Sequence, residues 1–298
     1  MARPPARVTS SGQPEERRGN RTRTRALRAL RRNPAGSLGL IITVAVVLGA
    51  IFGPLFAPYN PTAADLNAVL SPPSAVHLLG TDQLGRDILT RIIYGARVSL
   101  LIGFLTVAIA GTIGTIIGTI AGYVGGLLDT VVMRIVDVQL SFPFILLALT
   151  INAIVGIGFR NILVSLVLAG WVVYARVARA ETLKIKEREF VEAARGLGGN
   201  DLRIIFRHVV PMLLPPMIIL STLQVAQFMV AEAAISFLGF GIQPPTPAWG
   251  NMMADGRDYL FTSPWLVTFP GLALAITVLG INLLGDWFRD VLDPRFQP

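Results

Sequence analysis

Residues 190–211 read Phe190-Val-Glu-Ala-Ala-Arg-Gly-Leu-Gly-Gly-Asn-Asp-Leu-Arg-Ile-Ile-Phe-Arg-His-Val-Val-Pro211, a charged stretch between long apolar runs. The apolar side chains in its first part recur at i, i+3, i+4 and i+7, which is typical of one face of a helix. They are Phe190, Ala193, Ala194 and Leu197. Two of them, Ala193 and Ala194, are small, so another surface can approach this part of the predicted face closely.

The second part of the stretch carries turn and capping residues. Three glycines, at positions 196, 198 and 199, end the first helix, because glycine favours the left-handed backbone found after helix ends. Asn200 and Asp201 can cap a second helix. Pro211 suits the first turn of the apolar run that follows. The stretch therefore predicts a helix, a sharp turn and a second helix.

The rest of the chain is far more apolar than a soluble domain. Of its 298 residues, 53% are hydrophobic and only 15% are charged. Its charge-free runs are long enough to cross a bilayer. The first of them does not have the short apolar core of a signal peptide, so we expect it to remain as an uncleaved span. The runs predict six membrane-spanning helices, at residues 38–57, 98–128, 138–159, 162–178, 209–231 and 265–285.

Two of these runs have internal patterns. Gly114, Gly118 and Gly122 lie four residues apart in the second, and this spacing predicts a groove that another helix can approach. A short polar turn with Asp129, Arg134 and Asp137 is expected before the third, which has Pro143 near its start.

The fifth run carries a polar stripe on one helical face. Polar side chains within a membrane face the bundle interior or a water-filled path, since lipid leaves them without partners. The stripe is either a candidate pore lining or a structural hydrogen-bonding face. It consists of Gln224, Gln227, Phe228, Ala231 and Glu232.

The connecting segments give two further expectations. Leu84, Ile88 and Ile92 repeat every four residues, and Asp87 can pair with Arg91, which predicts an amphipathic helix at the membrane surface before the second span. Residues 239–263 form a Pro- and Gly-rich outer loop with Trp249 as an interfacial anchor.

The basic residues orient the chain. Residues 1–33 carry the whole net charge of +8, and this Arg-rich tail is expected to be largely disordered and cytoplasmic. In the six-span topology 21 Lys and Arg fall on one side of the membrane and five on the other. Cytoplasmic segments are the more basic ones, so residues 190–211 and both termini are predicted to be cytoplasmic. A juxtamembrane tail of this kind favours a topology signal over nucleic-acid binding.

Several kinds of chemistry are excluded. The chain has no cysteine, and neither Lys184 nor Lys186 follows a glycine, so no Gly-Lys-Ser/Thr phosphate loop exists. His77 and His208 fall on opposite sides of the membrane in this topology and cannot share a metal site. We expect no catalytic, cofactor or metal site in this chain. Any ATP and Mg are bound by a partner.

Several motifs resemble known permeases. Glu192, Ala193, Ala194, Gly198, Ile204, His208 and Pro211 are similar to the EAA loop of ABC-importer permease subunits. The segments 80–97, 239–263 and 286–295 resemble the C-type permease subunits of dipeptide and oligopeptide importers. The likeness covers nearly the whole chain from Pro34 onward.

This resemblance implies the type I ABC-importer fold in a bacterial cell membrane. It implies a heterodimer with a homologous B-type permease, two cytoplasmic ATPase subunits and an extracytoplasmic binding protein that delivers a di- or oligopeptide. In the coupling loop Ala193 and Ala194 are expected in a groove of the ATPase, Glu192 is expected to pair or cap there, and Gly198 is expected to hold the turn. Ile204 and Pro211 complete the motif.

The expected organisation has four parts. Residues 1–33 form the tail, 34–97 the first span and outer loop, 98–286 a five-helix domain with the coupling loop at 180–210, and 287–298 the cytoplasmic C-terminus. Three alternatives stay open: a related importer for a nickel complex or glutathione, an ion-coupled secondary transporter, and a membrane scaffold or receptor. Glu232, at the end of the fifth predicted span, is the only carboxylate of the polar stripe, which gives ion coupling little support.

Overall fold

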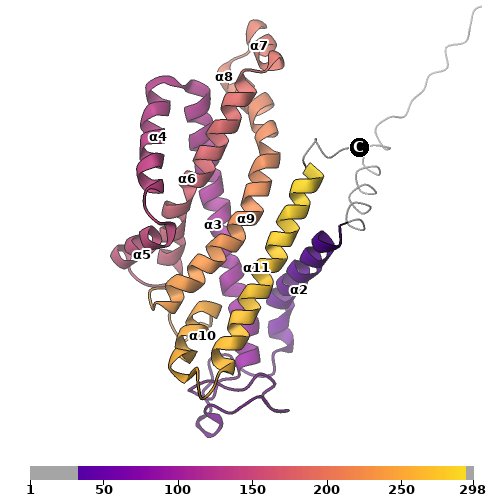
Figure 1. Cartoon of the computed structure of the whole chain (residues 1–298), viewed down its shortest axis with the longest axis vertical. Coiled ribbons are helices and arrows are strands. Elements are labelled where there is room, and N and C mark those ends of the chain that lie inside the picture. The colour runs from indigo at the N-terminus through magenta and orange to yellow at the C-terminus, as the bar shows by residue number, and fades with distance from the viewer. Residues whose placement is uncertain (1–32, 293–298) are drawn as a thin grey trace, which may run out of the picture.

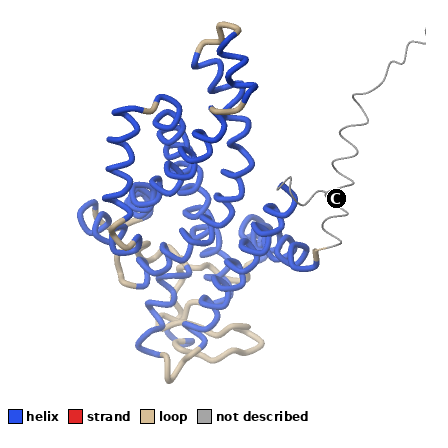
Figure 2. Tube along the Cα trace, turned by 45° about the horizontal axis from the view of Figure 1, so that its top comes forward, coloured by secondary structure: helices blue, strands red, loops and turns tan. Residues whose placement is uncertain are grey.

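A computed structural model of the chain describes residues 33–292, and every named element in this range is helical (Figure 1, Figure 2). The expected all-helical fold is confirmed. The prediction of a disordered tail falls on residues outside this range, apart from Asn33, which caps the first helix. The elements are α2 (Pro34–Phe56), η1 (Leu66–Ala68), α3 (Ile88–Val124), α4 (Gly126–Leu140), α5 (Phe144–Val155), α6 (Phe159–Lys186), α7 (Glu189–Gly196), α8 (Asp201–Ile204), the π-helical turn η2 (Ile205–Val209), α9 (Val210–Phe237), α10 (Trp249–Gly256), η3 (Arg257–Tyr259) and α11 (Trp265–Leu292).

Five continuous helical stretches within the described residues are long and apolar enough to cross a membrane. The pair α4 and α5 makes a sixth if it is counted as one span. The long helices form a bundle with two distinct ends (Figure 1). We call the end that carries α7 and α8 the α7 end, and the end that carries α10 the α10 end.

The third predicted span, residues 138–159, is not one continuous helix. α4 and α5 meet at a bend of 94°, and residues 141–143 separate them. Pro143 lies at the N-cap of α5 in an extended conformation, because proline has no N–H to continue the preceding helix. The expected polar turn is also wrong, since Asp129, Arg134 and Asp137 all lie within α4.

The predicted glycine groove on α3 is confirmed. A Cβ added to Gly118 would lie 2.1 Å from the carbonyl oxygen of Ala175, and one added to Gly114 would lie 2.2 Å from that of Trp171. Both contacts are with α6. The absence of side chains therefore lets the α3 and α6 backbones touch.

α6 continues past the boundary expected near residue 178 and ends at Lys186. Its basic residues pair with the acidic residues of α4. Arg179 Nε lies 2.5 Å from Asp129 Oδ1, and Arg176 pairs with Asp137. These ion pairs join α6 to α4 on either side of the expected boundary.

No amphipathic helix precedes the second span. α3 begins at Ile88, and Asp87 is its N-cap, with the side chain accepting a bond of 2.8 Å from the backbone N–H of Thr90. The expected Asp87–Arg91 pair is also wrong, since Arg91 contacts Asp82 and Asp255 instead. The four-residue repeat predicts a helix that begins one turn too early, because Leu84 lies in a loop.

The segment 239–263 is more ordered than the expected outer loop, because it contains α10 and η3. Trp249 is not an interfacial anchor: it is 2% exposed, and its indole N–H donates to the carbonyl of Ile92 over 3.1 Å. It belongs to an apolar core at the α10 end that includes Leu100, Met229 and Ile281.

Candidate coupling loop and translocation path

The predicted coupling loop extends beyond the long helices at the α7 end (Figure 1). Two fully packed side chains anchor it, Val191 in α7 (0% exposed) and Ile204 in α8 (1% exposed). Ile204 was expected to belong to the motif, whereas Val191 was not singled out. Its apolar character, three residues before Ala194, was the signal that could have identified it.

Most of the predicted small-residue face of α7 is left uncovered by residues 33–292. Leu197 is 89% exposed and Phe190 is 40% exposed. Ala193 and Glu192 are also exposed, while Ala194 is partly buried. The helix therefore turns Val191 fully and Ala194 partly toward the bundle, and it presents the rest of the expected face outward.

The turn after α7 has the predicted chemistry. Gly198 has a φ of +79°, and the N–H of Gly199 donates to the carbonyl of Ala194 over 3.0 Å. Asn200 is the N-cap of α8, where its side chain accepts a bond of 3.2 Å from the N–H of Leu202. Pro211 lies in the first turn of α9, as expected, and its side chain is exposed.

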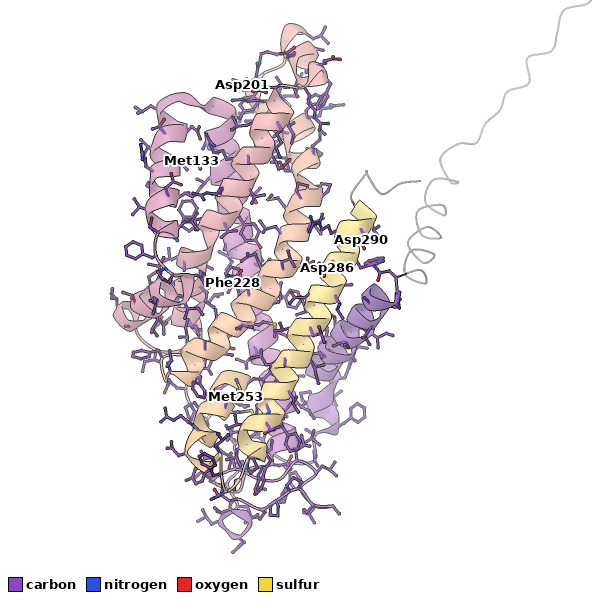
Figure 3. The ribbon with its side chains drawn as sticks, in the orientation of Figure 1. Met133, Asp201, Phe228, Met253, Asp286 and Asp290 are labelled. Carbon is purple, nitrogen blue, oxygen red and sulfur yellow. The ribbon has the colours of Figure 1, made fainter. Side chains whose placement is uncertain are left out.

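Behind the turn the loop contacts the end of α3. The Tyr123 hydroxyl donates to Asp201 Oδ1 over 2.8 Å and accepts from Arg195 Nη2 over 3.4 Å. This bond to the tyrosine raises the pKa of Arg195 above its usual value. Figure 3 shows Asp201 at the α7 end of the bundle. Lys186 Nζ donates to the carbonyl of Gly122 over 2.9 Å, next to Tyr123.

The residues of the predicted pore stripe do not share one environment. Phe228 is fully buried near the middle of the bundle (Figure 3), where it packs against Gly170 of α6. Glu232 is also fully buried, and it accepts bonds from Ser236 (2.7 Å) and Ser99 (3.2 Å).

Gln227 alone among the polar members of the stripe faces an open hollow. This hollow has a volume of about 500 Å³ and lies between α5, α9 and α11. Gln224 is 8% exposed and does not line it. Its other lining residues include Phe144, Ala231 and Asn282. Asn282, on the last span, was missed because it lies alone in an apolar run.

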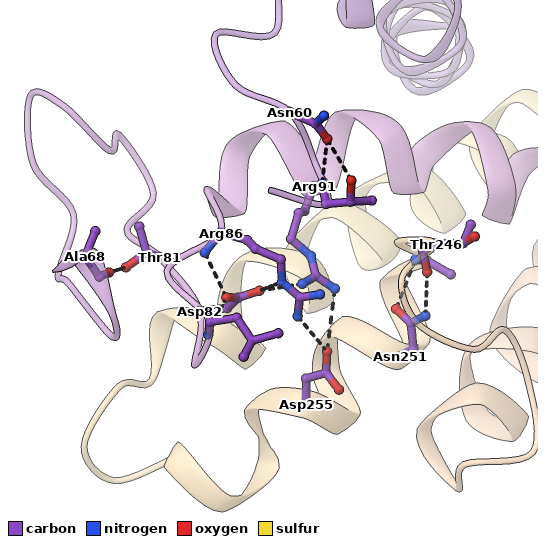
Figure 4. A network of polar contacts seen from close by, with 12 residues as sticks. Asn60, Ala68, Thr81, Asp82, Arg86, Arg91, Thr246, Asn251 and Asp255 are labelled. Carbon is purple, nitrogen blue, oxygen red and sulfur yellow. Dashed lines mark hydrogen bonds and ion pairs between the residues drawn. The ribbon is translucent and has the colours of Figure 1, made fainter. Parts of the chain in front are cut away.

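A buried ionic cluster joins the loop before α3 to α10 (Figure 4). Arg86 Nε lies 2.7 Å from Asp82 Oδ2, and Arg91 also contacts Asp82. Asp255 of α10 lies 3.6 Å from Arg86 and 3.5 Å from Arg91. The cluster was not predicted, because nothing in the sequence shows that residues so far apart meet.

The two histidines lie far apart in the chain and have separate contacts. His77 Nδ1 lies 3.1 Å from Asp87 Oδ1, and the ring of His208 lies 6.1 Å from that of Phe190. Across residues 33–292 no cluster of three or more His, Asp or Glu has the arrangement of a metal site.

Comparison with known proteins identifies the family. Residues 114–298 match the model of the binding-protein-dependent transport system inner membrane component, and residues 23–73 match the N-terminal TM domain of oligopeptide transport permease C. The chain is 42% identical over 272 residues to the dipeptide transport system permease protein DppC of Alkalihalophilus pseudofirmus, covering 91% of this chain and 90% of that protein. It is 43% identical over 273 residues to DppC of Escherichia coli K12, covering 90% and 91%.

A third relative is the di/tripeptide transport system permease protein DppC of Pseudomonas aeruginosa, 41% identical over 265 residues, covering 87% of this chain and 88% of that protein. The fold is similar to a chain in a structure of the MetNI methionine ABC transporter in inward facing conformations. The TM-score is 0.57 at 22% identity, covering 68% of this chain and 97% of that one. The chain therefore belongs to the family of binding-protein-dependent transport system inner membrane components, as a non-catalytic, multi-pass permease subunit of the oligopeptide permease C type.

Proposed function

We propose that this chain forms half of the translocation path of an ATP-driven importer for di- and oligopeptides. The names of its relatives support the cargo, since they are described as dipeptide or di/tripeptide permeases and are similar along about nine tenths of the chain. An extracytoplasmic binding protein delivers the peptide. A nickel complex or glutathione is the alternative cargo within the same importer class.

The uncovered face of α7 is the observation that carries the proposal. Exposed apolar side chains such as Leu197 are unfavourable in water, and here they lie on a loop that is anchored at Val191. A cytoplasmic ATPase subunit covers this face. Ala193 and Ala194 enter its groove, Glu192 pairs with a basic or N–H group there, and Gly198 holds the turn. ATP and Mg bind to the two ATPase subunits.

The distribution of basic residues supports the orientation. Eight Lys and Arg lie between residues 176 and 207, near the α7 end. The positive-inside rule then makes the α7 end cytoplasmic, together with the two termini. In this arrangement residues 34–97 form the first span and outer segment, 98–286 the five-helix transport domain with its coupling loop at 180–210, and 287–298 a cytoplasmic end.

The hollow beside Gln227 supports a path at an interface between subunits. The hollow is open in the single chain, and a second permease closes it in the assembly. That partner is a homologous B-type subunit. Gln227 and Asn282 offer hydrogen bonds to the peptide backbone along the path, whereas Gln224, Phe228 and Glu232 support the wall from within.

Alternating access follows from this assembly. ATP-driven closure of the ATPase pair moves the docked loops, and packed helices switch between discrete arrangements rather than deforming continuously. The path opens outward to receive the peptide and then inward to release it.

Cross-linking combined with uptake tests the proposal directly. The chain has no native cysteine, so Ala193→Cys introduces a single thiol. In the assembled complex it should form a disulfide with a cysteine in the ATPase groove, and proteoliposomes should take up labelled dipeptide only with internal ATP. Uptake by the permease pair without ATPase would overturn the proposal and favour an ion-coupled transporter.

A further inference from the structure

Tyr123 lies in the last turn of α3, where the coupling loop meets the bundle. It is 8% exposed. Its hydroxyl contacts Asp201 at the start of α8 and Arg195 at the end of α7. The Arg195 guanidinium also lies 5.9 Å from the centre of the tyrosine ring. One phenol therefore bonds to both helices that flank the Gly198 turn.

The turn needs such a connection if the loop is to move as one body. No atom lies within 4 Å of the position that a Cβ on Gly198 would occupy, so the turn itself has little packing. Val191 and Ile204 anchor the two helices through apolar contacts, which are not directional. Hydrogen bonds depend on angle as well as distance, so the Tyr123 hydroxyl fixes the orientation of α7 and α8 relative to α3.

α3 extends from this contact to the opposite end of the bundle. The helix has 37 residues, and it touches the backbone of the long helix α6 at Gly114 and Gly118. Lys186 joins the end of α6 to Gly122, one residue before Tyr123. At the α10 end, Arg91 of α3 contacts Asp255 of α10. α3 thus links the coupling loop to the ionic cluster.

We propose that Tyr123 is a positioning residue for energy coupling, which transmits displacement of the coupling loop to α3. The proposal rests on the proposed function, since it assumes that an ATPase moves the loop. Without the hydroxyl, the loop docks on the ATPase but rotates about the glycine turn. Part of the displacement is then lost before it reaches the path.

Tyr123→Phe tests this, because it removes the hydroxyl and keeps the ring. The assembled complex is measured in proteoliposomes for peptide uptake, for ATP hydrolysis and for the Ala193→Cys cross-link to the ATPase. The cross-link should stay, and uptake per ATP hydrolysed should fall by roughly fivefold, the equilibrium effect of one lost hydrogen bond. Asp201→Ala should give a similar fall, and Asp201→Asn, whose amide oxygen still accepts the bond, a smaller one.

Tyr174→Phe is the matched control. It also removes a buried tyrosine hydroxyl, which bonds to Ser221 of α9 over 3.3 Å and not to Arg195 or Asp201. Its uptake per ATP should equal that of the unmodified chain. An unchanged ratio in Tyr123→Phe, an equal fall in Tyr174→Phe, or loss of the cross-link in Tyr123→Phe would each overturn the coupling role. Failure of the cross-link with Tyr123 intact would instead overturn docking itself.

Discussion

The Arg97 side chain of α3 donates to the backbone carbonyl of Ala50 in α2 over 2.5 Å. Pro54 lies four residues after Ala50 within the same helix and has no N–H, so this carbonyl lacks its normal helical partner. Arg97 also donates to the carbonyl of Ile51 over 2.6 Å. An arginine from a neighbouring helix thus replaces the hydrogen bond that proline removes, and it joins the first span to the second.

Arg97→Leu should therefore destabilise the complex in detergent by about 1–3 kcal/mol, the effect of losing hydrogen bonds from a charged donor. Adding Pro54→Ala restores an N–H for the Ala50 carbonyl and should recover part of this loss. Thermal unfolding of the two single variants and the double variant measures the coupling between the sites. Strictly additive effects would contradict the explanation.

Asp82→Asn should be among the most destabilising conservative substitutions in the chain. It leaves Arg86 and Arg91 close together and buried, with Asp255 as the remaining counter-charge. Loss of one partner from a buried ion pair costs about 3–5 kcal/mol. Asp258→Asn is the control, because its pair with Arg257 is exposed and should contribute less than about 1 kcal/mol. Equal melting temperatures for the two variants would contradict a structural role for the cluster.

The local features of the fold could be predicted from the sequence because they depend on neighbouring residues. The Gly198 turn and the Asn200 cap require only residue types at fixed offsets. The glycine groove at Gly114 and Gly118 was also predictable, since its spacing matches the helical period. These are the features that define the coupling loop and the closest helix contact.

Features that depend on long-range contacts were not predictable. A tryptophan in a loop after a span is commonly an interfacial anchor, which is the role that the sequence predicts for Trp249. In the structure α10 folds inward and buries this side chain. The polar stripe likewise followed helical periodicity on α9, yet only neighbouring helices decide which of its members is covered. Glu232 is buried and accepts a hydrogen bond from Ser99 of α3, and nothing in the sequence of α9 indicates this contact.

Gly118→Ala should weaken the contact between α3 and α6. The added Cβ would lie 2.1 Å from the Ala175 carbonyl oxygen, so the backbones must separate. Overpacking of this kind costs about 1–3 kcal/mol. Gly49→Ala is the control, because no atom lies within 4 Å of its added Cβ in α2, and it should leave stability unchanged or raise it. Thermal melting in detergent compares them, and a stable Gly118→Ala variant would be inconsistent with backbone contact.

Gln227→Leu should lower peptide uptake without lowering thermal stability, because its side chain is exposed and faces the hollow. Gln224→Leu should leave uptake nearly unchanged, since this residue is buried away from the hollow. The two residues lie three positions apart in the same stripe, and the variants are compared by initial uptake rates at several peptide concentrations. A larger loss in Gln224→Leu would place the path on the other side of α9.

Gly198→Val should abolish ATP-coupled uptake while membrane insertion survives. The residue has a φ of +79°, a conformation that costs a residue with a side chain about 1–2 kcal/mol and is worst for a β-branched one. No neighbour obstructs the site, so the backbone rather than packing decides the outcome. Asparagine tolerates the left-handed region better, and Gly198→Asn should retain much of the uptake. Uptake assays together with the Ala193→Cys cross-link separate a misplaced loop from a missing subunit. Equal uptake by the valine and asparagine variants would show that the turn does not require its left-handed residue.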